Sequence, residues 1–370
     1  MHKQNLVNGN LTREEIFQKI LSSITKRKNV RLHLAPRFGK TKLIIELIKR
    51  DDPQTILWVT PSRKLAEEDI PAEFEKWGGE EYLDRLEVTT WSSLKKAQGK
   101  YDLIVLDEEQ FATEINCAQL IKNKLKGKKI SMTGTPSTRA DKDEVLFKVG
   151  LSKVAYKLTL EEAVTLEIIS EFEIVLAVVD LDNRPGTSVD YGDRSEQSVY
   201  EMLDQRAKKS YQNGPIPYEV IERANFIKNS PTKLRLAKQI LDQYCHGRTL
   251  IFSPYIHLAE ELCEHNYHSK SKSKEWLEKF QAKEINRLSL VNSGGVGFTF
   301  EGVESVLLMQ MDSNKTGLST QKIARSLLKQ GDKTVKVFIL VLDDTQDVSW
   351  INTGLAGFDR KRISVMRINL

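Results

Sequence analysis

Short apolar runs alternate with segments of helical periodicity through the first part of the chain. Runs of four to six apolar or β-branched residues predict strands, and the longer segments between them carry apolar residues at the spacing of amphipathic helices. In chain order, the strands are expected at 30–34, 55–60, 86–90, 103–106 and 129–133, and the helices at 41–49, 63–77 and 115–124. This alternation is typical of a parallel sheet wrapped by helices, so we predict a doubly wound α/β domain here.

A second series of the same kind fills the rest of the chain. Its strands are expected at 172–179, 249–252, 287–291, 305–309 and 335–342, with helices at 256–264 and 350–360. In the last helix, Trp350, Leu355 and Phe358 are expected to face the core. The polar segment 182–229 is predicted to be a loop followed by helices. We therefore predict two α/β domains, 1–155 and 156–370, with a loop and helical insertion at about 181–232.

Composition agrees with a globular protein and adds few constraints. Of 370 residues, 40% are hydrophobic and 29% are charged, and the formal net charge is +5. No apolar run approaches the roughly 18 to 20 residues that a membrane span needs, and the start is polar, so we expect a cytoplasmic protein without membrane contact, in the host cytoplasm if the source is viral. Three scattered cysteines favour neither a disulfide framework nor a zinc ribbon. The charge permits a polyanionic partner without requiring one.

A phosphate-binding loop is predicted directly after the first strand, in the segment APRFGKT at 35–41. Phosphate binding needs backbone N–H groups at a helix N-terminus, a lysine charge for the β and γ oxygens, and a hydroxyl for magnesium. Gly39, Lys40 and Thr41 supply these groups. The full pattern has a glycine five residues before Gly39, where this chain has Leu34. Arg37 either contacts phosphate or caps the loop.

The segment YDLIVLDEEQ at 101–110 predicts a second part of the same site. An apolar strand that ends in two acids places Asp107 toward a magnesium ion and Glu108 toward an attacking water, where a general base is needed. Together with the loop at 35–41, the strand predicts a site for ATP and Mg²⁺ in the first domain.

At 107–110 the sequence Asp-Glu-Glu-Gln resembles the DEAD/DEAH box of superfamily 2 helicases, and further segments follow in that family's order. They resemble motif Ia (59–63), the neighbouring strand-touching motif (89–94), motif III (133–136), motif IV (250–254), motif V of the chromatin-remodelling and phage branches (292–300) and the start of motif VI (321–325). The resemblance covers nearly the whole chain. It implies two RecA-like doubly wound parallel-sheet lobes in tandem, with an ATP cleft between them.

The resemblance also implies roles for individual residues. Gln321 and Arg325 would act in catalysis, Thr133 and Thr135 would couple the ATP state to strand movement, and Gly297 would contact ATP. Gln18, after Phe17, would read adenine. Residues expected to contact nucleic acid are Thr60, Pro61, Arg63, Thr90, Ser253, Asn292 and Ser293. A residue such as Thr60 or Ser253 can equally serve as a helix cap.

One position departs from the family pattern. Motif VI normally supplies two arginines three residues apart, and this chain has Arg325 followed by Leu328. An arginine finger is worth about a thousandfold or more in phosphoryl transfer, and Lys329 lacks the planar fork of arginine. The leading prediction is an ATP-dependent helicase or translocase, a monomer acting on DNA rather than RNA, with replication or recombination proteins as possible partners. The alternatives are a duplex translocase that does not separate strands and a weakly hydrolysing ATP-dependent clamp. Another P-loop enzyme, such as a kinase, would leave the second half of the chain unexplained.

Overall fold

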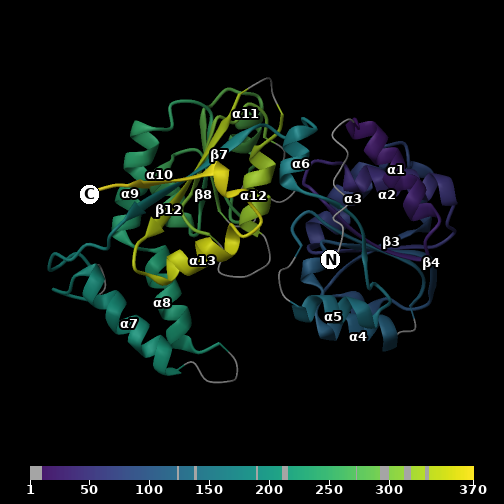
Figure 1. Ribbon diagram of the computed structural model, residues 1–370, viewed down its shortest axis with the longest axis horizontal. Helices are drawn as coiled ribbons and strands as arrows, with labels where there is room; N and C mark the ends of the chain where they lie inside the picture. The colour runs from purple at the N-terminus through teal and green to yellow at the C-terminus, as the bar shows by residue number, and fades with distance from the viewer. Residues whose placement is uncertain are drawn as a thin grey trace. The chain divides into compact units, whose positions relative to one another are not determined.

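The computed structural model describes residues 11–122, 125–136, 140–188, 191–210, 216–271, 273–291, 300–311, 318–329 and 333–370, of which 140–142, 318–320 and 325 are described by their backbone alone. These residues fall into two compact units (Figure 1). Unit 1 comprises the described part of Met1–Ile169 with that of Lys315–Gln321, and unit 2 comprises the described part of Ser170–Asn314 with that of Lys322–Leu370.

Unit 1 is a six-stranded sheet with helices on its faces (Figure 1). Its elements are α1 (Arg13–Thr25), β1 (Asn29–Leu34), α2 (Lys40–Asp51), β2 (Ile56–Thr60), η1 (Leu65–Asp69), α3 (Ile70–Lys76), η2 (Glu80–Arg85), β3 (Leu86–Thr90), η3 (Leu94–Lys96), β4 (Lys100–Asp107), η4 (Glu109–Phe111), α4 (Glu114–Lys122), β5 (Lys126–Thr133), α5 (Ala140–Lys148), β6 (Val154–Leu158) and α6 (Leu160–Thr165). The strand order is β3-β2-β4-β5-β1-β6, and every neighbouring pair is parallel. All carboxyl ends of the strands therefore lie at one edge of the sheet.

The predicted strands of unit 1 are confirmed, and one further strand was missed. Every residue of β2 is buried, as expected for a central strand of a parallel sheet covered on both faces. The missed strand, β6, lies at the sheet edge, and only Leu158 of its five residues is buried. An edge strand needs no apolar run, so its sequence gives a weak signal. The predicted helix 63–77 contains a π-helical turn, η1, directly before Pro71, which has no N–H for the helical ladder.

Unit 2 is a seven-stranded sheet, also parallel throughout. Its elements are β7 (Phe172–Val179), α7 (Glu196–Ser210), α8 (Tyr218–Lys228), α9 (Pro231–Gln243), β8 (Thr249–Ser253), α10 (Ile256–Leu262), β9 (Asn266–Tyr267), α11 (Glu275–Gln281), β10 (Arg287–Val291), β11 (Ser305–Leu308), α12 (Leu318–Ser326), β12 (Val335–Leu342), α13 (Gln346–Gly354), η5 (Arg360–Arg362) and β13 (Ile363–Arg367). The strand order is β13-β7-β12-β11-β8-β10-β9.

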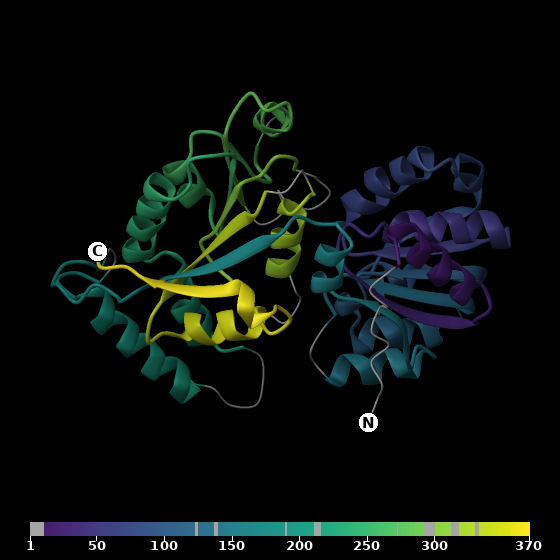
Figure 2. The same cartoon turned by 45° about the horizontal axis from the view of Figure 1, so that its top comes forward.

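The end of the chain differs from the prediction. The predicted helix 350–360 is wrong in its bounds, because α13 begins at Gln346, where Thr345 accepts a hydrogen bond from the Asp347 amide, and ends at Gly354. The chain then forms β13 beside β7 (Figure 2). Trp350, Leu355 and Phe358 are buried as predicted. Among the described residues, no helix has both the length and the apolar character of a membrane span.

A buried ion pair lies in the interior of unit 2. Lys233, in the first turn of α9, and Asp347, in the first turn of α13, have fully buried side chains and lie 2.5 Å apart. Lys233 Nζ also donates to Gln310 Oε1 at 2.8 Å, and Gln310 Nε2 donates to Asp347 Oδ1 at 2.8 Å. Gln310 follows β11, a central strand. The hydrogen-bonded group of Lys233, Asp347 and Gln310 therefore connects the starts of α9 and α13 to the end of β11.

Loss of one partner of this ion pair should destabilise unit 2 strongly. Lys233→Met leaves the Asp347 carboxylate buried without its cation, which typically costs about 3–5 kcal/mol. Urea unfolding followed by circular dichroism should show this loss for the single variant and a smaller loss for the double variant Lys233→Met, Asp347→Leu.

The matched control is Lys238→Met, which breaks the half-exposed pair between Lys238 and Glu261. Pairs of that kind contribute about 0.2–1 kcal/mol. Equal destabilisation by the buried and the exposed substitution would contradict the assignment.

Candidate nucleotide-binding site

The loop between β1 and α2 presents a helix N-terminus suited to an anion. Gly39, the N-cap of α2, has φ 102° and ψ 44°, a left-handed conformation that glycine adopts without a side-chain penalty. The first helical hydrogen bond runs from the Leu43 amide to the Gly39 carbonyl at 2.9 Å. The amides of Lys40, Thr41 and Lys42 therefore have no partner within the helix. No side chain caps this end, and its first turn carries no acid, so the helix dipole favours a negative ligand.

Helix α1 supports this loop from behind. Arg13 Nη2 donates to the carbonyls of Arg37 and Phe38 at 3.0 and 3.1 Å. Phe17 is buried against Phe38, with ring centroids 6.1 Å apart. Arg37 has φ 70°, an uncommon conformation for a residue with a side chain. Gln18 lies on the exposed side of α1, where its amide donates to Glu14. The sequence did not identify Arg13, whose position depends on how α1 packs.

The two acids lie at the carboxyl end of β4. Asp107 is the last residue of the strand, and its carbonyl accepts a hydrogen bond from the buried Trp91 indole at 2.9 Å. Glu108 has φ 51° and ψ 62°, again left-handed. Its Oε1 lies 3.9 Å from Lys40 Nζ, and both side chains are mostly buried. The structure therefore places Lys40 of the loop and Glu108 of the acidic pair together.

Side chains after β4 and β5 form a hydrogen-bonded group around Glu108. The Thr133 hydroxyl lies 3.2 Å from Glu108 Oε2 and 2.6 Å from Gln110 Oε1. The Gln110 amide donates to Glu108 Oε2 at 2.9 Å and to Thr135 Oγ1 at 3.3 Å. Gln321, which clusters with unit 1, also donates to Thr135 Oγ1, at 3.2 Å. One oxygen of Glu108 is thus held by neighbouring side chains, and the other faces Lys40.

The loop after β5 approaches the P-loop closely at Gly134. A Cβ atom at this position would lie 2.9 Å from Lys40 Nζ and 3.2 Å from the ring of Pro36. The contact follows from the strand order, because β5 lies between β1 and β4. The segment after β5 therefore contacts both the phosphate loop and the acidic pair.

Glu109 forms a buried charged group beneath the site. Glu109 is buried, with 2% of its surface exposed. Its carboxylate accepts hydrogen bonds from Arg31 at 2.7 and 3.2 Å and from the Ser131 hydroxyl at 2.5 Å. It also lies 2.8 Å from His33 Nε2. Burial alone would raise the pKa of Glu109, but hydrogen bonds and charge from His33 and Arg31 outweigh that effect and lower the pKa to about 2. The ionised carboxylate ties β1 and β5 to the turn that carries Glu108.

The expected nucleic-acid residues of unit 1 follow β2 and β3. Thr60 is fully buried, and its hydroxyl has no hydrogen-bond partner in the described part of the chain. Pro61 is half-buried, and Arg63 is exposed and paired with Glu67 at 2.6 Å. The Thr90 hydroxyl accepts a hydrogen bond from the Ser93 amide at 3.2 Å, which is a turn-capping role. All of these residues lie at the carboxyl edge of the sheet.

Fewer of the expected site residues can be placed in unit 2. Ser253, at the end of β8, is buried, and its hydroxyl lies 3.3 Å from that of Ser289. Arg325 lies in α12, where only its backbone is described. Three expected residues lie outside the described part of the chain: Asn292, Ser293 and Gly297.

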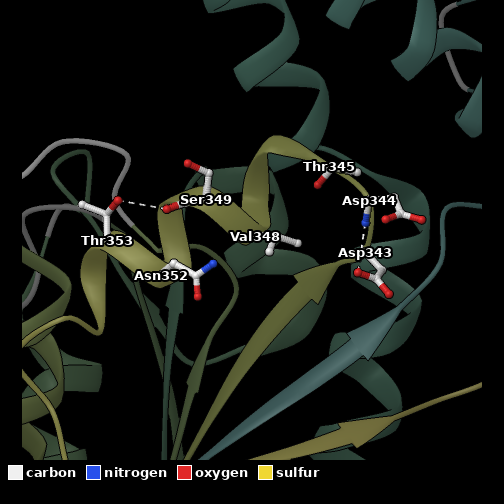
Figure 3. Close-up of a pocket in the computed structure, with 7 residues that line it drawn as sticks. All are labelled: Asp343, Asp344, Thr345, Val348, Ser349, Asn352 and Thr353. Atoms are coloured by element: carbon white, nitrogen blue, oxygen red, sulfur yellow. Dashed lines mark hydrogen bonds between the residues drawn. The ribbon is translucent and has the colours of Figure 1, made fainter. Parts of the chain in front are cut away.

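An open pocket of about 620 Å³ in unit 2 lies where β12 leads into α13 (Figure 3). Its lining residues are Asp343, Asp344, Thr345, Val348, Ser349, Asn352 and Thr353. The lining includes two carboxylates, and Arg367 forms an ion pair with one of them, Asp343. In the described part of the chain, no group of three or more His, Cys, Asp or Glu residues could hold a metal ion. A magnesium ion at the unit 1 site would need phosphate oxygens besides Asp107 and Thr41.

Comparison with known proteins supports the fold. No family model and no curated protein sequence matches the chain. Among solved structures, the chain is similar to the ATP-dependent Type ISP restriction-modification enzyme LlaBIII bound to DNA, with a TM-score of 0.61 and 13% identity, over 99% of this chain and 32% of that one. It is also similar to the helicase domain of Hef from Pyrococcus furiosus, with a TM-score of 0.55 and 13% identity, over 91% of this chain and 96% of that one.

These similarities establish the fold alone. The two units are α/β units with parallel sheets, consistent with the two predicted RecA-like lobes, and the fold is similar to that of the Hef helicase domain. The chain spans about a third of the length of the restriction-modification enzyme.

A side chain at position 134 should weaken nucleotide binding. In Gly134→Ala the new Cβ would displace Lys40 Nζ, the cation predicted to bind the phosphates. We expect the Kd for ATP, measured by calorimetric titration, to rise about tenfold, or ~1.4 kcal/mol. Gly357→Ala is the matched control, because a Cβ there meets no atom within 4 Å. An unchanged Kd for Gly134→Ala would show that this contact does not position the lysine.

Proposed function

We propose that the protein is an ATP-dependent nucleic-acid helicase or translocase. The observation that carries the proposal is the approach of Lys40 to Glu108 at 3.9 Å, beneath a helix N-terminus whose first amides have no helical partner. A phosphate-binding lysine beside a candidate general base is what hydrolysis of a nucleoside triphosphate requires. The similarity of the fold to the Hef helicase domain supports a nucleic-acid motor over other P-loop enzymes.

Each group of the unit 1 site has a role in this proposal. The α2 amides and Lys40 bind the β and γ phosphates. Thr41 and Asp107 would hold a magnesium ion, which neutralises developing charge on the phosphate oxygens. Glu108 orients the attacking water and accepts its proton, while Thr133 and Gln110 keep the carboxylate in place.

The remaining roles extend the proposal beyond unit 1. Arg325 stabilises transition-state charge, and Thr133 and Thr135 transmit the state of the nucleotide. Backbone contacts at the carboxyl edges of the sheets hold the nucleic acid without reading its sequence. DNA is the proposed substrate because the similar restriction-modification enzyme is described as bound to DNA.

Substitution of Lys40 or Glu108 should abolish turnover by different routes. Lys40→Ala removes the phosphate charge and should reduce ATP binding as well as hydrolysis. Glu108→Gln should retain ATP binding but lose hydrolysis by about a hundredfold or more, the usual contribution of a general base. The measurement is steady-state ATP hydrolysis with and without single-stranded, duplex and forked DNA or RNA, and the nucleic acid that stimulates the wild type identifies the substrate.

The control for these substitutions is Glu114→Gln, a carboxylate at the exposed start of α4. Its rate should equal that of the wild type. Hydrolysis that survives unchanged in Lys40→Ala would remove the assignment of the site.

Strand separation and translocation on intact duplex are two forms of the proposed activity. A strand-displacement assay detects the first, and displacement of a triplex-forming strand from an intact duplex detects both. Triplex displacement without strand displacement would identify a duplex translocase.

A weakly hydrolysing clamp is the second candidate, and the observation that favours it is Leu328. This residue lies beyond the end of α12, and its carbonyl accepts a hydrogen bond from the Ser170 hydroxyl at 3.0 Å. If the clamp is correct, the wild type should bind ATP and DNA with little turnover, and Leu328→Arg should raise kcat by about tenfold or more. A motor that is already active should gain nothing from this substitution.

A further inference from the structure

A cluster of cations lies at the amino-terminal edge of the unit 1 sheet, opposite the edge that carries the P-loop. Because all the strands are parallel, residues that precede or begin β1, β4 and β5 share this edge, and Lys129, farther along β5, lies beside the first residue of β1. We call the cluster the amino-edge patch, and its members are Lys26, Arg27, Lys28, Lys100, Lys126 and Lys129.

Strand pairing brings the members of the amino-edge patch together. Lys100 and Lys126 are register partners at the starts of β4 and β5. Lys129 pairs with Asn29, and its amide donates to the Lys28 carbonyl at 3.3 Å. Partners on adjacent strands lie about 5 Å apart, so the segments that carry these cations lie side by side at this edge although they are distant in sequence.

The positive charge of the patch is not neutralised by the described residues. None of its six members forms an ion pair with them, whereas the adjacent Lys128 pairs with Asp51 at 2.8 Å. The carboxylate of Asp102, which accepts hydrogen bonds from the amides of Gln54 and Thr55, reduces the local positive charge only in part, because it is one anion beside six cations. Burial, and then the charge of Lys28, lowers the pKa of Lys129. Like charges held side by side oppose one another, and a polyanion bound across them would relieve that repulsion.

We propose that the amino-edge patch binds the phosphate backbone of a nucleic acid, separately from the nucleotide site and from the carboxyl-edge residues. Lysine and arginine side chains on such a surface bind phosphates without sequence preference and release counterions. Protein partners, in contrast, are held mainly by aromatic and apolar anchors, which these six side chains do not provide. This binding surface is additional to the proposed motor activity, because nucleic acid can bind to it without ATP.

The test is charge reversal in the triple variant Arg27→Glu, Lys28→Glu, Lys126→Glu, at three exposed members of the patch. The net charge changes from +5 to −1, since three cations become three anions (+5 − 6). Lys208→Glu, Lys238→Glu, Lys279→Glu, on helices of unit 2, is the matched control with the same net charge. Binding of labelled duplex and single-stranded DNA is measured by fluorescence anisotropy without nucleotide over a series of salt concentrations.

The patch variant should bind DNA at least about tenfold more weakly than the control at low salt. The logarithm of the DNA association constant should fall less steeply with the logarithm of the salt concentration. The magnitude of this slope should decrease by about 2 to 3, because each lost phosphate contact removes roughly 0.7–0.9 from it. Its ATP hydrolysis without nucleic acid should equal that of the wild type. If the Glu variant does not fold, the same three positions changed to Gln should still reduce the slope.

Two results would overturn the proposal. In the first, the patch variant and the control have equal affinity and equal slopes. In the second, the patch variant loses binding to labelled polyglutamate but keeps DNA binding, which would identify an acidic polypeptide as the partner. The binding assay contains no ATP, so its result does not depend on hydrolysis. If the wild type did not hydrolyse ATP, the proposed motor would be refuted, but the binding assay would still test the amino-edge patch.

Discussion

The Glu109 carboxylate is the constraint on which the organisation of unit 1 depends. A buried charge that lacks compensation costs several kcal/mol, and here Arg31 and His33 from β1 and Ser131 from β5 surround the carboxylate that follows β4. The three strands can satisfy it only if they lie side by side with their carboxyl ends at one edge. The same arrangement holds the neighbouring residue, Glu108, in its left-handed conformation, which would be unfavourable in an isolated turn.

The position of β5 between β1 and β4 determines which chemical groups meet. Gly134 reaches the P-loop on one side, and Thr133 reaches Glu108 on the other. A displacement of Lys40 would therefore affect the segment after β5 directly. The segment after β5 therefore lies against both Lys40 and Glu108, which is the physical basis for its proposed role in transmitting the state of the nucleotide.

Each unit contains a buried charged group that joins several of its elements, and the residues that form this group differ between the two units. Unit 2 buries Lys233 against Asp347 and Gln310, where three elements converge below the carboxyl edge of its sheet. Its open pocket is lined by Asp343 and Asp344, whereas Lys40 and the uncapped helix N-terminus of α2 lie in unit 1. In unit 1 the two sheet edges also differ. The carboxyl edge carries Asp107 and Glu108 with Lys40, and the amino edge carries the six cations of the patch near Asp51 and Asp102.

The sequence by itself determined the α/β class, the central strands and the edge strand β3, and the segments that resemble motifs. Central strands of a parallel sheet are continuous apolar runs, and each motif is a short local pattern. It did not reveal β6 or β13, since an edge strand can be half polar, and it placed the last helix too late. Tertiary structure alone decided the strand order, and with it the contacts of Arg13 with the P-loop, of Gly134 with Lys40, and of Glu109 with Arg31. These contacts join residues far apart in the chain, and their formation depends on which strands pair, a choice that no local pattern encodes.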